Sequence, residues 1–177
     1  MTSSSDITDK FEVAIKDFIP IFDQPKDDNI RGVQKFLLKT CLSIRLSGSK
    51  AGKVPGFVLP DAAYKNQPGV TASFDEDDTP LDEYNPLVTR ETKAWEQRKL
   101  QALWKNHLDN QDRTHTTKHG CCLFILNAFE EVHYISLRDE DTYYKMVSPL
   151  KLLAHFSEEI GGLKVTDVVT LIGELTG

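Results

Sequence analysis

The sequence predicts a mostly α-helical fold: a compact domain of about six helices, with one long irregular segment containing glycine and proline and at most a short strand pair. Two observations lead to this prediction. Apolar residues recur at steps of three and four over most of the chain, which is the period of an amphipathic helix. Glycine and proline gather instead in residues 47–87, where their density excludes a long helix.

Length and composition agree with this fold class. At 177 residues, 40% of them hydrophobic, the chain can bury its own core without a disulfide or a metal ion. Its three cysteines, an odd number, favour a reducing compartment. The chain opens on no signal-peptide pattern, and no apolar run reaches the roughly 20 residues that span a bilayer. We therefore expect a cytoplasmic protein with no membrane partner and no cofactor.

The N-terminal part is expected to hold an arm and one strong helix. Residues 1–17 are predicted to form a flexible arm with room for a short helix through Ile7 and Phe11, and residues 18–177 a single helical domain. A helix is predicted over residues 28–46, with Asp27 or Asp28 as its N-cap. Its core-facing stripe consists of Ile30, Val33, Leu37, Cys41 and Ile44. Within the irregular segment, residues 56–59 are long enough only for a short strand.

Four more helices are expected in the second half. The third begins after Thr89 as N-cap and places Trp95 and Trp104 in the core; the alternative is that one tryptophan is an exposed anchor for a partner. After a polar break at residues 109–118, the fourth presents Cys122, Ile125, Leu126, Phe129 and Val132 on one face. The fifth runs from Ser148 to Gly161 with Pro149 in its first position, and the last spans residues 165–175.

Few residues of the chain suggest chemistry. His115 and His119 are four apart, a spacing that on a helix lets both face one metal ion, and Cys121 could add a thiolate, which permits a zinc site or a small enzyme. The adjacent Cys121-Cys122 pair supplies the fourth ligand poorly, however, and Lys118 places a cation beside the site. His155 is expected to be a partly buried histidine bonded to a backbone group. We therefore assign no catalytic, cofactor-binding or metal-binding residue.

The charge disfavours a protein that binds nucleic acid chiefly through phosphates. The formal net charge is -6, whereas such proteins are basic or carry a basic stripe. The acidic run at residues 75–78 would repel a phosphate backbone. The basic residues Lys93, Arg98, Lys99 and Lys105 are scattered in the sequence.

Several weak motifs nevertheless occur in a characteristic order. They are a hydrophobic lead-in at residues 18–25, a glycine-rich segment at 48–60 followed by Ala63-Tyr64, a helix end at 124–132, the run 137–141 followed by Tyr143-Tyr144, a capped helix at 147–156, and Gly161-Gly162-Leu163. This order resembles the Gag (capsid-type) polyprotein of copia-type LTR retrotransposons, especially those of diatoms and other algae, in its N-terminal capsid region. Family members carry glycine before the aromatic residue near Tyr143, where this chain has Thr142, so we expect a turn of different shape.

The resemblance implies a structural protein that self-associates and that forms, or derives from, the shell of a virus-like particle. It also implies that element RNA is contacted through other Gag regions. The chain lacks the zinc knuckle and the Asp-Ser/Thr-Gly protease motif, and family members continue past the position of Gly177 into a second helical domain. We therefore expect weak homo-oligomers, from a partial element or a repurposed host protein. The alternatives are a host-domesticated protein-interaction adaptor of the same fold and a small Cys/His metal-dependent enzyme.

Overall fold

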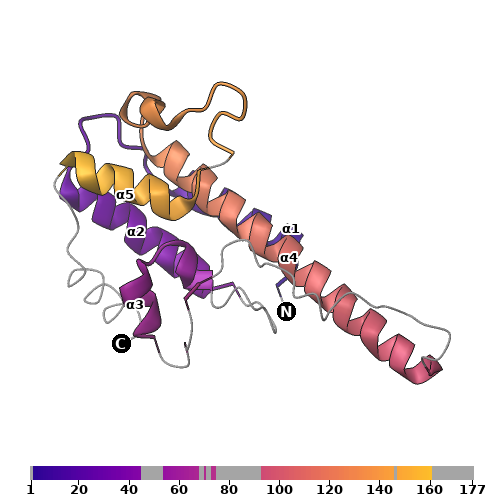
Figure 1. Ribbon diagram of the computed structural model, residues 1–177. Coiled ribbons are helices and arrows are strands. Elements are labelled where there is room, and N and C mark those ends of the chain that lie inside the picture. The colour runs from indigo at the N-terminus through magenta and orange to yellow at the C-terminus, as the bar shows by residue number, and fades with distance from the viewer. Residues whose placement is uncertain are drawn as a thin grey trace.

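A computed structural model describes residues 2–44, 54–67, 70, 73–74, 93–145 and 147–160 (Figure 1). The predicted helix at 165–175 and most of the irregular segment lie outside this part. The α-helices are α1 (Ser4–Asp17), α2 (Asp27–Leu42), α3 (Asp61–Lys65), α4 (Ala94–Ala128) and α5 (Pro149–Ile160), joined by 3₁₀ helices at Val54–Phe57, Glu131–His133 and Ile135–Leu137. Among these residues the only β pairing is two isolated bridges. The mostly α-helical prediction is confirmed.

Helix α1 occupies the segment that was expected to be a flexible arm with a possible short helix, and it is longer than that expectation. The Ser3 hydroxyl accepts a hydrogen bond from the Asp6 amide (3.1 Å), and the Asp6 carboxylate accepts one from the Ser3 amide (3.0 Å). This reciprocal pair satisfies two amides at the helix start, where no intrahelical acceptor exists. Ile7, Phe11 and Ala14 are buried. Residues 4–17 thus form a capped helix that belongs to the core.

Helix α1 runs parallel to the second half of α4 (Figure 1). The Ser4 hydroxyl donates to the Asp112 carboxylate at one end, and the Ile21 amide donates to the Ala128 carbonyl (2.8 Å) at the other. The buried residues of both helices advance by steps of three and four: Ile7, Phe11 and Ala14 on α1, and Thr114, Thr117, Cys121, Phe124 and Ala128 on α4. Two such stripes can interlock along their length, as they do in coiled coils.

Helices α2 and α5 complete the core: both pack on α4 and on each other, and α2 also contacts α1 (Figure 1). The predicted stripe is confirmed, since Ile30, Val33, Leu37 and Cys41 of α2 and Ile44 just after it are all buried. In α5, Leu152, Leu153 and Phe156 are buried, and the Phe156 ring stacks on Phe129 with 4.2 Å between centroids. The predicted start of α5 is also confirmed, because Pro149 is its first residue and the Ser148 hydroxyl accepts from the Lys151 amide.

The expected break at residues 109–118 is wrong, because α4 is one helix of 35 residues. Its polar middle stays helical for two reasons. Thr114, Thr116 and Thr117 turn their hydroxyls onto the carbonyl four residues earlier, at 2.8 Å in each case, so they do not compete with the backbone ladder. Thr114 and Thr117 are also fully buried. Tertiary packing therefore outweighs the low helix propensity of this stretch.

Other boundaries and placements also differ from expectation. Helix α4 begins at Ala94 after Lys93, well past Thr89, and α2 begins after Lys26, whose amide donates to the Asn29 side chain (2.9 Å). Part of the segment predicted as a strand lies in the 3₁₀ helix Val54–Phe57. Helix α4 ends at Ala128, so Val132 lies outside it and is exposed.

Candidate interaction surfaces

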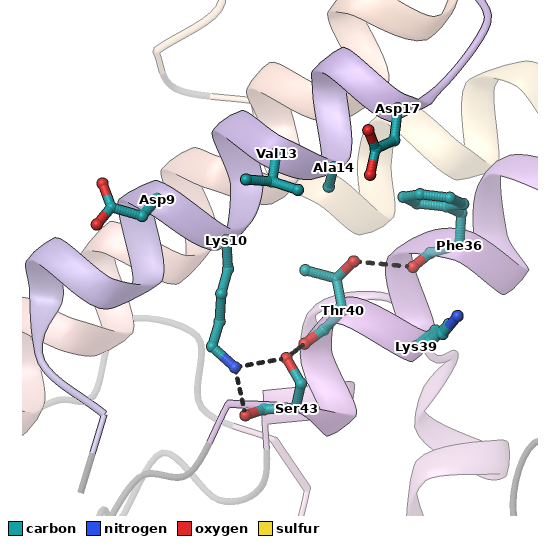
Figure 2. A pocket seen from close by; sticks show the side chains of 9 residues that line it. All are labelled: Asp9, Lys10, Val13, Ala14, Asp17, Phe36, Lys39, Thr40 and Ser43. Carbon is teal, nitrogen blue, oxygen red and sulfur yellow. Dashed lines mark hydrogen bonds between the residues drawn. The ribbon is translucent and has the colours of Figure 1, made fainter.

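An open groove of about 390 Å³ lies between α1 and α2 (Figure 2). Helix α1 forms one wall and α2 the other. The lining residues are Asp9, Lys10, Val13, Ala14 and Asp17 on α1, Phe36, Lys39 and Thr40 on α2, and Ser43, which caps the C-terminal end of α2. We call this feature the α1–α2 groove.

The position of the groove follows from which side chains of α1 and α2 are buried in the core and which are left exposed. On α1, Ile7 and Phe11 are buried in the core, which leaves Val13, at 56% exposure, on a neighbouring face that opens toward α2. On α2, Phe36 is half-buried, because its ring stacks on Phe124 with 5.4 Å between centroids. Val13, Ala14 and Phe36 give the groove an apolar floor.

Of the charged side chains that line the groove, one forms hydrogen bonds across it and the others are exposed to solvent. The Lys10 ammonium donates to the carbonyl and the hydroxyl of Ser43, each at 3.0 Å, and so joins α1 to the C-terminal end of α2 (Figure 2). A cation is stabilised there, because helix carbonyls at that end lack intrahelical donors. Asp9, Asp17 and Lys39 are exposed and form no ion pair within the described residues. The α1 wall therefore presents two carboxylates to solvent.

The first turns of α4 form a second candidate surface. They extend beyond the N-terminal end of α1 (Figure 1), which begins beside Asp112. Trp95 is 60% exposed, contrary to its predicted core position, and Leu103 is 42% exposed. Arg98 and Lys99 lie three and four residues after Trp95, on the same side of the helix, and both are exposed. We call Trp95, Arg98, Lys99 and Leu103 the cationic face of α4.

The histidines and the cysteine considered for chemistry lie on different sides of α4. His115 and His119 are exposed, whereas Cys121 is fully buried. The structure therefore does not bring these three residues together, and among the described residues no group of three metal-ligating side chains occurs. The Cys121 sulfur lies 3.6 Å from that of Cys41. Burial, with a further contribution from Cys41, raises the pKa of the Cys121 thiol well above its ordinary value, which keeps it protonated and a poor nucleophile.

His155 has the structural role that was expected for it. Its side chain is half-buried, and Nε2 lies 2.9 Å from the carbonyl oxygen of His133. That contact joins α5 to the 3₁₀ helix Glu131–His133. The prediction of a partly buried histidine bonded to a backbone group is confirmed.

The turn around Thr142 has an unusual backbone. Tyr143 has φ of 56°, a left-handed conformation that glycine adopts at lower cost. The Arg138 guanidinium lies 4.5 Å from the centroid of the Tyr143 ring, which supports this conformation by a cation–π contact. The next residue, Tyr144, donates its hydroxyl to the Glu131 carboxylate (2.9 Å). Desolvation and then Glu131 raise the pKa of Tyr144 to about 12.

Sequence reasoning identified one of the two surfaces in part. It offered an exposed tryptophan as an alternative, but it treated Lys93, Arg98, Lys99 and Lys105 as scattered. The structure places Arg98, Lys99 and Lys105 with Trp95 on the first turns of one helix, directly after Lys93. The α1–α2 groove left no signal in the sequence, because it depends on how two helices cross.

Comparisons with known proteins identify no relative. No family model, no curated protein and no solved structure matches the chain. In the part of the chain that the structure describes, no helix combines the length and apolarity that a bilayer span requires.

Proposed function

We propose that the chain is a self-associating structural protein of the capsid type, as its resemblance to the Gag proteins of copia-type retrotransposons implies, and that it acts in the cytoplasm. The observation that carries this proposal is the cationic face of α4, where Trp95 is 60% exposed on turns that extend beyond α1. Tryptophan and arginine are enriched at protein interfaces and among the residues that dominate binding energy.

The α1–α2 groove supports the same function. An apolar floor with charged walls is the form of a surface that accepts an amphipathic helix. A catalytic function finds less support, because the Cys121 thiol is buried away from His115 and His119. RNA would be contacted mainly by other regions of a Gag protein, since the net charge of this chain is -6.

The test is sedimentation velocity of the purified chain over a wide concentration range, with negative-stain microscopy of the concentrated sample and an RNA titration in the same buffer. We expect monomer at low concentration and regular oligomers at high concentration, with weak RNA binding. A chain that stays monomeric at every concentration and binds a protein partner instead would contradict assembly and favour the adaptor. A monomer that binds RNA tightly would favour an RNA-binding protein.

A further inference from the structure

We infer that the α1–α2 groove of one copy binds the cationic face of α4 of a second copy. This inference rests on the proposed self-association and adds to it the two surfaces that meet. Each copy carries one groove and one cationic face on different elements, so the contact is heterologous and can repeat from copy to copy.

Charge complementarity selects a second copy as the occupant. The chain as a whole is acidic, but the stretch from Lys93 to Lys105 holds four basic residues and one acidic residue, Glu96. The groove presents Asp9 and Asp17 on its α1 wall, and neither forms an ion pair in the described structure. The basic side chains of the cationic face and the carboxylates of the groove attract each other, and their positions set the register of binding.

The positions of the charges define an orientation. Lys10, the basic residue on the α1 wall, is hydrogen-bonded to Ser43, and Lys39 gives the α2 wall a positive charge. Arg98 and Lys99 of the second copy would therefore face α1, where Asp9 and Asp17 lie. Like charges meeting across an interface are costly, so Lys39 disfavours the reverse orientation.

Dimensions and apolar surface agree with this pairing. The two surfaces have the same length along their helices. The α1 wall extends from Asp9 to Asp17 and the cationic face from Trp95 to Leu103, eight residues further along in each case, so each is about 12 Å long. Trp95 and Leu103 are exposed on the free chain, as is Val13 in the groove. Docking would remove these apolar side chains from water together, with Trp95 as the large anchor.

The experiment reverses the charge of each surface and then of both. Asp9→Lys/Asp17→Lys changes the groove, and Arg98→Glu/Lys99→Glu changes the cationic face. Near a helix end, each new charge is compatible with the helix dipole. Arg98 and Lys99 are in the early turns of α4, where a negative charge is favourable, and Asp17 ends α1, where a positive charge is favourable. Circular dichroism and thermal unfolding would establish that every variant is folded.

Matched controls place the same charge changes elsewhere. Asp23→Lys/Glu140→Lys and Lys145→Glu/Lys151→Glu alter exposed residues outside both surfaces. They separate a local contact from the effect of net charge on association. Sedimentation velocity over a concentration series gives the midpoint of association for each protein.

Each double reversal should raise the association midpoint by at least about tenfold relative to its control, because like charges then meet. The chain that carries all four reversals should recover association, as should an equimolar mixture of the two double variants. If the wild-type chain associates but the reversals behave like their controls, or the fourfold variant fails to recover, the inference is wrong and the proposed function stands. If the wild-type chain is monomeric throughout, the proposed function fails as well.

Discussion

At the scale of single residues, a glycine of α4 lets an aromatic ring of α1 approach closely in the core. A Cβ atom at Gly120 of α4 would lie 2.2 Å from the Phe11 Cδ2 atom of α1, well inside van der Waals contact. The Phe11 ring is 2% exposed, so it has little room to move aside. Gly120 therefore lets α1 and α4 approach closely, although glycine weakens an isolated helix.

We predict that Gly120→Ala destabilises the protein by about 1–3 kcal/mol through overpacking, despite the better helix propensity of alanine. Gly32→Ala on α2 is the control, because no atom lies within 4 Å of the Cβ that it would add. The control should stabilise the fold by up to about 1 kcal/mol. Urea unfolding measures both, and equal effects of the two changes would show that Phe11 does not press on Gly120.

Asp139 anchors the turn that contains Thr142. Its Oδ1 atom accepts from the Thr142 amide (2.7 Å), the Thr142 hydroxyl (2.9 Å) and the Asp141 amide (3.0 Å). These bonds favour the carboxylate form, and the pKa of Asp139 is lowered below its ordinary value, the Thr142 amide being the largest cause. The stability that Asp139 contributes is therefore present above the ordinary pKa of aspartate and is lost as pH falls through the lowered value.

We predict that Thr142→Val brings the pKa of Asp139 part of the way back to its ordinary value. The change removes the hydroxyl donor but keeps the backbone amide, which is the larger cause. Carboxyl NMR titration of wild-type and variant protein measures the shift. An identical titration curve in the two proteins would mean that the hydroxyl bond contributes nothing.

At the scale of elements, α5 depends on its apolar face for its place in the fold. Leu153 and Phe156 are 3% and 1% exposed, and the Phe156 ring stacks on Phe129 and lies edge-on to Tyr134. We predict that Leu153→Ala and Phe156→Ala each cost about 2–5 kcal/mol, since each leaves a cavity in the core.

The control for α5 is Lys151→Ala on its exposed face, which should change stability by no more than about 0.5 kcal/mol. Chemical denaturation monitored by circular dichroism gives all three values. Negligible changes for both core variants would show that α5 does not hold the core together.

Helices were predictable wherever an apolar stripe or a clear cap specified them. The stripe from Ile30 to Cys41 on α2 and Pro149 at the start of α5 were confirmed, whereas the N-cap predicted for α2, Asp27 or Asp28, was wrong, because that helix begins after Lys26. The continuity of α4 was not predictable, because Thr114 and Thr117 are polar residues on a buried face. Their burial depends on α1, which is about 100 residues away in the sequence.

At the scale of the whole molecule, the interaction surfaces depend on the arrangement of helices. Trp95 belongs to an apolar pattern that suits a buried helix, and only the length of α4 beyond α1 leaves its first turns exposed. The groove likewise arises where Val13 of α1 faces Phe36 of α2. A periodic pattern identifies the face of a helix, but it does not show whether another element covers that face.

The central claim is that copies of this chain associate through the cationic face of α4. The most direct measurement is acrylamide quenching of Trp95 fluorescence in a Trp104→Phe variant, which leaves Trp95 as the single tryptophan. The sample is measured over the concentration range in which sedimentation velocity follows oligomer formation. We predict that the quenching constant falls as oligomers form, because Trp95 is 60% exposed in the single chain and would be covered in the contact. A quenching constant that stays the same while oligomers form would contradict the claim.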